Sequence, residues 1–436
     1  MKTFRIGGVH LPEYKFSANA PIQKAELPKQ AVVMLGQNLG APSVAIVAKG
    51  DKVKAGQLIA KQGGFIGANL HSPVSGVVAK IDDVVDASGY KQSAIIIDTE
   101  GDEWSEGIDT SSTLIKEIKL NKEEIIKAIA DAGVVGLGGA AFPTHVKLTP
   151  PLDKPIKVLL IDAVECEPYL TSDHQLMLEK GEEVLVGTTI LMKAIGVDRA
   201  VIGIEANKPD IIKYFSKLAK NYTGIEICPL KVRYPQGGEK QLIDAVMQRQ
   251  VPSGALPMEV GAIVQNVGTV YAVYEAVQKN KPLVERVITI TGKKMAKPSN
   301  FLARVGTPFS QLIDAAGGLP QETGKVVSGG PMMGKALTSL DVPVTKGSSG
   351  LLIIPSFEAQ RREMNGCIRC AKCVHICCMG LQPYLLASLV ENDMLDKAQK
   401  EQLPDCIECG SCHYTCPSNR PLLDYIRLGK LKLKRT

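Results

Sequence analysis

Several features that would place this 436-residue chain in other protein classes are missing from its sequence. No stretch reaches 18 uncharged apolar residues, so the sequence predicts no membrane-spanning helix. Dense lysine and arginine blocks are also missing, although the formal net charge is +6, and this argues against nucleic-acid binding. Residues 1–10 lack the apolar core of a signal peptide, so we expect a cytoplasmic protein with reduced thiols.

Cysteine is missing from the first 165 residues and then concentrated near the end of the chain. Nine of the eleven cysteines lie between residues 367 and 416. A disulfide framework is a poor explanation for this group, because we expect a reducing compartment. The other two, Cys166 and Cys228, are isolated in the sequence, and we expect Cys166 to be a small packed residue and not a redox thiol.

The clustered cysteines form two copies of one spacing. The pattern C-x2-C-x2-C-x3-C begins at residue 367 and begins again 39 residues later, at residue 406. In bacterial ferredoxins this spacing holds two [4Fe-4S] clusters, and the fourth cysteine of each run binds the other cluster. Tetrahedral zinc, which also binds C-x2-C pairs, is disfavoured because the four-cysteine run is repeated whole. The predicted ligand sets are Cys367, Cys370, Cys373 and Cys416 for one cluster and Cys406, Cys409, Cys412 and Cys377 for the other.

Two adjacent thiols, Cys377 and Cys378, leave one cysteine unassigned. Only Cys377 completes the spacing, and Cys378 stands where the second run has Pro417. We therefore predict that Cys378 is not a ligand. His375 and His413 lie inside the runs, and we expect both to be exposed loop residues near the clusters.

Residues 31–81 carry short β-branched runs broken by turn residues, which predicts a small all-β module. The order of two phrases, GDKVKAGQLIA and then SPVSGVV, resembles the barrel-sandwich domain that carries biotin or lipoate in other proteins. Those carriers have a lysine between the phrases, whereas the connecting GGFIGANLH has none. We therefore expect a structural module without a swinging cofactor.

The middle of the chain, from residue 121 to about residue 280, alternates helical and strand patterns. A helix is predicted at 121–132, with Asn121 as its N-cap, Glu124 three residues further on and Gly133 at its end. Buried-strand runs such as IKVLLIDA and RAVIGIEA then alternate with helices such as EEVLVGTTILMKAIG. This alternation predicts a mainly parallel sheet covered by helices.

The predicted fold class is multidomain α/β, with four domains in chain order. We expect a barrel-sandwich-like β module at 1–110, an α/β body at 111–283, a compact α+β module at 284–357 and a ferredoxin-like domain for two [4Fe-4S] clusters at 358–436. The last domain ends in a local basic run, RLGKLKLKRT, at 427–436. That run is either a solvated helix end or a contact for anionic lipid or an acidic partner.

A glycine-rich stretch, GLGGAA at 136–141, formally matches the dinucleotide pattern G-x-G-x-x-G/A. That pattern needs a strand before the loop and a helix after it, whereas here a predicted helix precedes the loop and FPTHVKL follows it. A standard Rossmann turn is thus disfavoured. A loop that lets backbone amides approach a phosphate or a flat ring remains the better interpretation.

Four motifs, in the same order, resemble those of the NADH-binding flavoprotein subunit of respiratory complex I and of related hydrogenases and formate dehydrogenases. They are GLGGAAFPTHVKL, VECEPYLTSD, YPQGGEKQ and VQNVGT. With the β module in front and the cysteine runs behind, the whole chain resembles the C subunits of Rnf complexes, the membrane-bound ferredoxin:NAD oxidoreductases. The resemblance implies that 111–283 binds FMN and NADH and that 284–357 is a β-grasp module of the soluble-ligand-binding (SLBB) type.

The resemblance also implies, position by position, a site for FMN and NAD(H). Phe142 and Lys147 would sit beside the flavin or the nicotinamide. Glu165 and Glu167 would face the ring and the NADH pocket. The residues implied to line FMN are Gly136, Gly138, Gly139 and Ala140. Those implied to hold its ribityl or phosphate groups are Gly238, Glu239, Asn266 and Thr269.

Three positions depart from the motifs of the family. Ala141 stands where the family has glycine, Lys240 where it has a second glutamate, and Gly268 where it has glutamate. Of the three, Lys240 bears most directly on how a dinucleotide would lie.

These features together predict electron transfer. A nicotinamide exchanges a hydride, an iron–sulfur cubane accepts one electron at a time, and a flavin can do both. We expect hydride exchange between NAD(H) and FMN and single-electron passage through two [4Fe-4S] clusters, with no protein acid or base as catalyst. The resemblance implies a peripheral subunit of an ion-translocating complex on the cytoplasmic face of the cell membrane. Its partners would be integral-membrane and iron–sulfur subunits and, indirectly, ferredoxin.

Two other functions stay open at the level of sequence. A cobalamin reductase of the propanediol-utilisation type looks built from the same modules and would differ in its electron acceptor. A non-catalytic adaptor would use its iron–sulfur clusters only as a wire, and its flavin fold would be vestigial.

Overall fold

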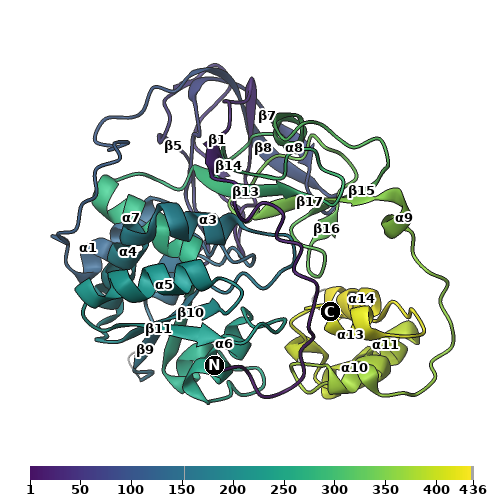
Figure 1. Cartoon of the computed structure of the whole chain (residues 1–436). Helices are drawn as coiled ribbons and strands as arrows, with labels where there is room; N and C mark the ends of the chain where they lie inside the picture. Colours follow the sequence, from purple (N-terminus) through teal and green to yellow (C-terminus); the bar gives the residue numbers. More distant parts are fainter. Residues whose placement is uncertain (152, 434–436) are drawn as a thin grey trace.

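The computed structural model describes residues 1–151 and 153–433, and it consists of a β-rich end, an α/β body and a small helical module (Figure 1). The β-rich end is at the top of Figure 1, the body at the lower left and the helical module at the lower right. None of the helices in this described part has the length and apolar character that crossing a bilayer requires. Within the basic run at 427–436, residues 434–436 lie outside the described residues, so both interpretations of that run stay predictions.

Two small antiparallel sheets form the N-terminal β module. Their strands are β2 (Gln30–Met34), β3 (Val44–Ala45), β4 (Lys52–Val53), β5 (Leu58–Lys61), β6 (Leu70–His71), β7 (Ser75–Val85) and β8 (Lys91–Gly101). One sheet has the order β2-β8-β7-β4 and the other β3-β5-β6. Both sheets bury apolar residues in one core, to which Val33, Ile59 and Ile95 contribute. The module is an all-β sandwich, as the sequence predicts.

A four-stranded parallel sheet forms the centre of the α/β body. Its strands are β9 (Val158–Asp162), β10 (Ala200–Glu205), β11 (Ile225–Leu230) and β12 (Ala262–Asn266). All neighbouring pairs in the order β11-β10-β9-β12 are parallel. Every residue of β10 is buried, as expected for a strand whose two faces are both covered.

Helices cover both faces of the parallel sheet. They are α1 (Lys122–Asp131), α2 (Thr144–Lys147), α3 (Ser172–Glu179), α4 (Gly181–Ile195), α5 (Pro209–Leu218), α6 (Glu239–Met247) and α7 (Val267–Lys279), with short 3-10 turns at Ala219–Asn221 and Pro257–Val260. Helices α1, α4, α5 and α7 share the core on one face, whereas α6 packs on the other. The helix predicted at 121–132 is confirmed, and Asn121 and Glu124 form a capping box at its start.

The third module is a mixed sheet with one packed helix, which agrees with the predicted α+β character. Its elements are β13 (Glu285–Thr291), β14 (Ser299–Arg304), α8 (Phe309–Ala315), β15 (Thr323–Ser328), β16 (Lys335–Ala336) and β17 (Gly350–Pro355). A further strand, β1 (Ile22–Lys24), comes from the N-terminal segment and pairs in parallel with β14. The first 24 residues therefore pack on the other modules and not in the β sandwich.

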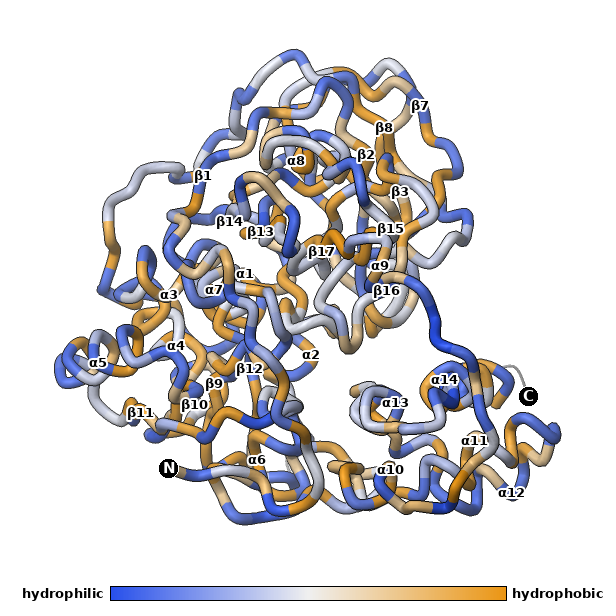
Figure 2. The backbone as a smooth tube through the Cα atoms, turned by 45° about the vertical axis from the view of Figure 1, so that its right-hand side comes forward, coloured by the Kyte–Doolittle hydropathy of each residue, from blue (hydrophilic) through white to orange (hydrophobic). Residues whose placement is uncertain are grey.

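Short helices make up the C-terminal module. They are α10 (Lys372–His375), α11 (Pro383–Glu391), α12 (Leu395–Lys400), α13 (Ser411–Thr415) and α14 (Leu422–Leu433), with a 3-10 turn at Leu403–Asp405. Leu386, Val390 and Ile426 form its buried core. A hydrophilic segment after α9 (Ser356–Ala359) connects it to the third module (Figure 2). The two cysteine runs extend into α10 and α13, which contact each other.

Candidate functional site

The order of strands in the α/β body reverses between β9 and β12. Strands β10 and β11 are added on one side of β9, whereas β12 lies on its other side. In open α/β sheets such a reversal leaves a crevice at the carboxyl ends of the two strands, and ligands bind there. Asp162 ends β9 and Asn266 ends β12, so the candidate site begins with these two residues.

Three helices begin beside this crevice. Asn266 is the N-cap of α7 and accepts the Gly268 N–H at 2.9 Å. Glu165 accepts the Asp173 N–H at 2.8 Å, at the start of α3. Gly238 is the N-cap of α6. Because N-terminal amides and the helix dipole favour negative charge, these helix ends suit a phosphate group.

The segment that leads into α6 comes close to the end of β9. A Cβ added to Gly237 would lie 3.2 Å from Asp162 Oδ1. Burial raises the pKa of Asp162 to about 7, and the nearby Asp173 carboxylate contributes to this rise. The crevice therefore contains a buried carboxyl whose pKa is raised above its ordinary value.

The glycine loop GLGGAA lies against the start of α7. Leu137 donates its N–H to Thr269 Oγ1 at 2.8 Å, and Thr269 is fully buried. A Cβ added to Gly138 would lie 3.3 Å from the Cβ of Asn266. Gly139 has a φ of +114°, and a Cβ added there would meet no atom within 4 Å. The loop therefore leaves open space over its backbone, where a ring or a phosphate can approach closely.

The far end of the glycine loop is held by its own backbone and by the β sandwich. Gly136 donates its N–H to the Phe142 carbonyl at 2.8 Å, which closes the loop. Ala140 is exposed, and Ala141 has a left-handed φ of +49°. Leu39 of the β module donates its N–H to the Ala141 carbonyl at 3.0 Å. The structure thus brings the loop residues implied for FMN together at one exposed turn.

A buried cation lies behind the glycine loop. Arg286 on β13 is 5% exposed, and its guanidinium lies 3.5 Å from the Leu137 carbonyl. It also donates to the Lys346 carbonyl at 2.5 Å. Burial lowers the pKa of Arg286 to about 10, while the Asp173 carboxylate opposes that shift. The sequence motifs do not include Arg286, although its place between Glu285 and the run VITIT of a predicted strand could have pointed to it.

Asp173 is a second site residue that the motifs do not single out. Its Oδ2 accepts a hydrogen bond from Asn266 Nδ2 at 2.8 Å. A Cβ added to Gly268 would lie 3.6 Å from Asp173 Oδ1, so a carboxylate from α3 lies beside the position where the family has glutamate. Burial, and then the Glu165 carboxylate, raise the pKa of Asp173.

Lys147 and Glu239 form an ion pair of 2.5 Å at the edge of the crevice. Lys147 comes from α2 and Glu239 is the first residue of α6. Lys147 also donates to the Val264 carbonyl of β12 at 3.0 Å, so it ties α2 to both α6 and the sheet. The neighbouring Lys240 lies outside this pair and reaches the Pro252 carbonyl at 3.4 Å.

Glu165 and Glu167 contact different parts of the molecule. Glu165 accepts N–H groups at the start of α3, beside the crevice. Glu167 accepts the N–H groups of Met332 at 3.2 Å and Met333 at 2.8 Å, in a loop of the third module. Burial raises the pKa of Glu167 to about 7. Glu167 thus links the α/β body to the third module.

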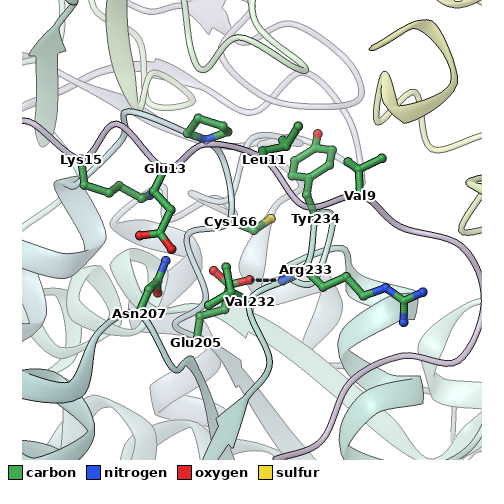
Figure 3. Close-up of a pocket in the computed structure, with 11 residues that line it drawn as sticks. Val9, Leu11, Glu13, Lys15, Cys166, Glu205, Asn207, Val232, Arg233 and Tyr234 are labelled. Atoms are coloured by element: carbon green, nitrogen blue, oxygen red, sulfur yellow. Dashed lines mark hydrogen bonds between the residues drawn. The ribbon is translucent and has the colours of Figure 1, made fainter. Parts of the chain in front are cut away.

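A separate pocket lies at the carboxyl ends of β10 and β11 (Figure 3). Val9 and Lys15 of the N-terminal segment line one side of it. Glu205 accepts the Arg233 backbone N–H at 3.2 Å, and burial raises the pKa of Glu205 to about 7. Burial also raises the pKa of the Cys166 thiol well above its ordinary value, which agrees with a packed residue. No residue implied for FMN lines this pocket.

One cavity joins Cys377 to the second cysteine run. This cavity is lined by Cys377, Cys406, Cys409 and Cys412 and by apolar side chains of α11 and α14. The fold therefore brings together the four cysteines that the spacing assigns to one cluster, although Cys377 belongs to the first run. Cys378 lines the same cavity, and its Sγ lies 3.9 Å from Cys409 Sγ.

The other predicted ligands lie nearer the surface. Cys367 and Cys370 are exposed, and Cys373 and Cys416 pack in one small apolar cluster with Leu422. Within residues 1–151 and 153–433, no three His, Cys, Asp or Glu side chains are arranged to hold a single metal ion. A cubane differs from a single ion because its thiolates bind separate iron atoms and so surround a volume. The cysteine-lined cavity is suited to such a group.

The short segment 234–239 reaches from the crevice to the cysteine cavity. Tyr234 donates its hydroxyl to the Cys409 carbonyl at 2.8 Å. At the other end of the segment, Gly237 faces Asp162 and Glu239 pairs with Lys147. Six consecutive residues thus run from the crevice to the wall of the cysteine cavity.

Three domain families match the chain in order. They are the RnfC barrel sandwich hybrid domain at residues 2–102, the Nuo51 FMN-binding domain at 129–275 and the SLBB domain at 287–336. These matches correspond to the β sandwich, the α/β body and the third module. They confirm the predicted multidomain α/β fold and its relation to the complex I flavoprotein.

Curated relatives are similar along nearly the whole chain. The C subunit of the proton-translocating ferredoxin:NAD(+) oxidoreductase complex of Clostridium ljungdahlii is 45% identical over 92% of this chain and 87% of its own length. The C subunit of the Na(+)-translocating complex of Acetobacterium woodii is 41% identical over 99% of this chain and 97% of its own length. The chain belongs to the family of Rnf complex C subunits.

Solved structures share the fold of this Rnf C subunit. A chain of the NAD+-reducing [NiFe]-hydrogenase in the H2-reduced state matches with a TM-score of 0.53 and 18% identity, over 67% of this chain and 60% of that one. An NAD+-reducing [NiFe]-hydrogenase in the air-oxidized state matches with a TM-score of 0.51 and 19% identity, over 70% and 63% of the two chains. At this identity the likeness shows the fold alone.

Three features of the crevice in this Rnf C subunit are of the kind that a flavin mononucleotide needs. A Cβ added to Gly139 would meet no atom within 4 Å, and α6 and α7 begin beside the crevice, where helix N-termini favour an anion. Arg286 adds a buried positive charge behind the loop.

Proposed function

We propose that this chain is the peripheral subunit of an ion-translocating ferredoxin:NAD oxidoreductase and passes electrons between NAD(H) and two [4Fe-4S] clusters through FMN. The observation that carries the proposal is the segment 234–239, which reaches the candidate flavin crevice at one end and the cysteine cavity at the other. The relatives, which are named as subunits of such complexes, support it.

When bound, FMN would accept a hydride from NADH and release the two electrons one at a time. The residues of the chain would bind the flavin and orient it. The glycine loop, fixed by the bond from Leu137 to Thr269, would hold the ring, and the starts of α6 and α7 would favour the charge of the phosphate. Arg286 favours negative charge at the loop from behind. No side chain of the crevice has to act as an acid or a base.

The cysteines divide into two ligand sets in this proposal. Cys377, Cys406, Cys409 and Cys412 hold the cluster that lies against the α/β body. The set at the surface is Cys367, Cys370, Cys373 and Cys416. The cluster in the cavity is therefore the nearer one to the flavin, and the surface cluster is the further one.

In the assembled complex, the chain would lie on the cytoplasmic face of the membrane. Its partners would be integral-membrane and iron–sulfur subunits, and ferredoxin would be an indirect electron partner. Family membership favours this assignment over cobalamin reduction.

The test uses the full-length chain, reconstituted anaerobically with FMN, iron and sulfide. We expect stoichiometric FMN binding and NADH-dependent reduction of an artificial dye. Absence of flavin binding would favour the alternative of a non-catalytic adaptor that only passes electrons through its iron–sulfur clusters. Co-purification from the source cell with integral-membrane subunits is expected, whereas co-purification with a cobalamin enzyme in their place would favour the reductase alternative.

A further inference from the structure

The two cysteine runs form loops of the same shape but of opposite charge. CIRCAKC at 367–373 and CIECGSC at 406–412 have identical cysteine spacing. Arg369 and Glu408 occupy the same position in the two loops, and both have a left-handed backbone, with φ of +55° and +57°. The loops can therefore be compared position by position, and their differences reflect what surrounds each loop.

The second loop faces the rest of the protein. Glu408 forms ion pairs with Arg427 at 3.2 Å and Lys430 at 2.9 Å, so its charge is neutralised within the module. Gly410 lies under the third module, because an added Cβ would lie 2.8 Å from the Met332 carbonyl oxygen. The second loop is covered, and its charge is paired.

The first loop faces solvent. Arg369 stands where the second loop has Glu408, and Lys372 stands where it has the fully buried Ser411. Ala371 stands where the second loop has glycine, and it is exposed, so nothing crowds its methyl group. The differences between two otherwise matching loops are thus an added pair of cations and the absence of a cover.

The residues just before the first loop are also exposed to solvent. All residues of 361–372 are exposed. Arg361 is paired with Asp424 at 2.7 Å, but within the described residues no carboxylate lies within 4 Å of Arg362, Arg369 or Lys372. We name Arg362, Arg369 and Lys372 with the exposed Cys367 and Cys370 the basic loop surface.

We propose that the basic loop surface docks a carboxylate-rich iron–sulfur subunit of the same complex, which exchanges electrons with the cluster on the first run. The inference rests on the proposed function, because it needs that cluster to be present. One electron leaves the reduced surface cluster and reduces the oxidised cluster of the partner, so no bond or proton changes place.

Charge and exposure together identify this kind of partner. Unpaired cations around a redox centre attract and orient a surface of carboxylates. Met364 and Ile368, which are 53% and 67% exposed, add apolar area to the same segment. Apolar area beside the charges suits a lasting subunit interface better than a brief encounter with a soluble carrier. The exposed cysteines then lie at the contact, where the gap between two clusters is shortest.

The test measures how tightly the reconstituted full-length chain binds the remaining subunits, purified as an assembly that lacks this chain. The variant Arg369→Glu/Lys372→Glu reverses two charges of the basic loop surface. The matched control, Lys397→Glu/Lys400→Glu, makes the same charge change at exposed positions on α12. We expect the first variant to bind about tenfold or more weakly in dilute salt, with the difference shrinking as salt screens the charges. The control is expected to bind like the unmodified chain.

Any other outcome contradicts the inference, the choice of partner or the proposed function. Equal affinity of all three proteins, or an equal loss in both variants, overturns the inference. A changed reduction potential of the cluster with unchanged affinity would mean that the cations tune the cluster. That result would also overturn the inference. Weakened binding of a soluble ferredoxin, with the assembly unaffected, would refute the choice of partner. Iron below about eight atoms in the unmodified chain would instead contradict the proposed function.

Discussion

At the scale of single residues, the adjacent thiols Cys377 and Cys378 line the same cavity, so position alone does not separate them. The spacing assigns Cys377 as the ligand and makes Cys378 the counterpart of Pro417. We predict that Cys378→Pro keeps about eight irons per chain, whereas Cys377→Ala loses the cluster of the second run. Iron analysis and electron paramagnetic resonance of the two variants check this. Loss of this cluster from Cys378→Pro as well would contradict the assignment of Cys377 alone as the ligand.

Thr269 is predicted to act on flavin binding through the glycine loop. Its Oγ1 accepts the Leu137 N–H at 2.8 Å in a fully buried place, so Thr269→Val leaves that N–H without its partner. An unmade buried hydrogen bond costs about 1–3 kcal/mol, which corresponds to FMN affinity that is weaker by about 5- to 150-fold. Thr269→Ser keeps the hydroxyl and serves as the control. Fluorescence titration with FMN measures both, and identical affinities would contradict this role.

Glu205 gives a prediction about pH. Burial raises the pKa of this carboxyl from 4.5 to about 7, so the folded chain holds the proton more tightly than the unfolded chain. The contribution of Glu205 to stability therefore falls as pH rises between those two values. Glu205→Gln cannot ionise, and we expect its urea midpoint to fall less between pH 5.5 and 7. An equal fall of the urea midpoint in both proteins would refute the raised pKa of Glu205.

At the scale of elements, the two cysteine loops offer a matched pair of substitutions. Gly410 has a φ of +78°, and a Cβ there would lie 2.8 Å from the Met332 carbonyl oxygen. Gly410→Ala is expected to cost about 1–3 kcal/mol and to loosen the contact between the cysteine module and the third module. Ala371→Gly, at the equivalent exposed position with a φ of +56°, is expected to leave stability unchanged or slightly raised.

Urea unfolding and limited proteolysis of the connecting segment after α9 check this pair. Faster cleavage in Gly410→Ala alone is the expected result. Equal behaviour of the two variants would mean that the third module does not press on the second loop.

Elements whose pattern is local could be predicted from the sequence. The capping box of α1 and the apolar runs of β9 and β10 appear where the residues indicate, because caps and buried runs depend on near neighbours. The cysteine spacing likewise assigns Cys377 of the first run to the cluster of the second run, and Cys377 lines one cavity with the cysteines of the second run.

Other features could not be predicted, because they depend on contacts between distant segments. The sequence gives no sign that β1 pairs with β14 in another module. Arg286 and Asp173 reach the crevice from β13 and α3, outside the glycine-rich motifs. Glu167, two residues from Glu165, turns to the Met332–Met333 backbone instead of the crevice, and nothing in its sequence position indicates this.

At the scale of the whole molecule, the modules meet around the path proposed for electrons. The N-terminal segment crosses the α/β body and reaches the cysteine module, where Gly8 donates its N–H to the Ile376 carbonyl at 2.9 Å. Tyr234 makes the second link, to the Cys409 carbonyl. We predict that Tyr234→Phe binds FMN normally but slows the transfer of electrons from NADH to the clusters. Rapid-mixing spectroscopy separates the two steps, and unchanged cluster reduction would remove Tyr234 from this role.

The central claim is that electrons from NADH reach the clusters only through a flavin bound in the crevice. The most direct measurement is an anaerobic NADH titration of the reconstituted full-length chain, with and without FMN, followed by low-temperature electron paramagnetic resonance. We predict signals of reduced [4Fe-4S] clusters in the FMN-loaded chain and none in the FMN-free chain. Clusters that NADH reduces without FMN, or that stay oxidised with FMN bound, would contradict the account.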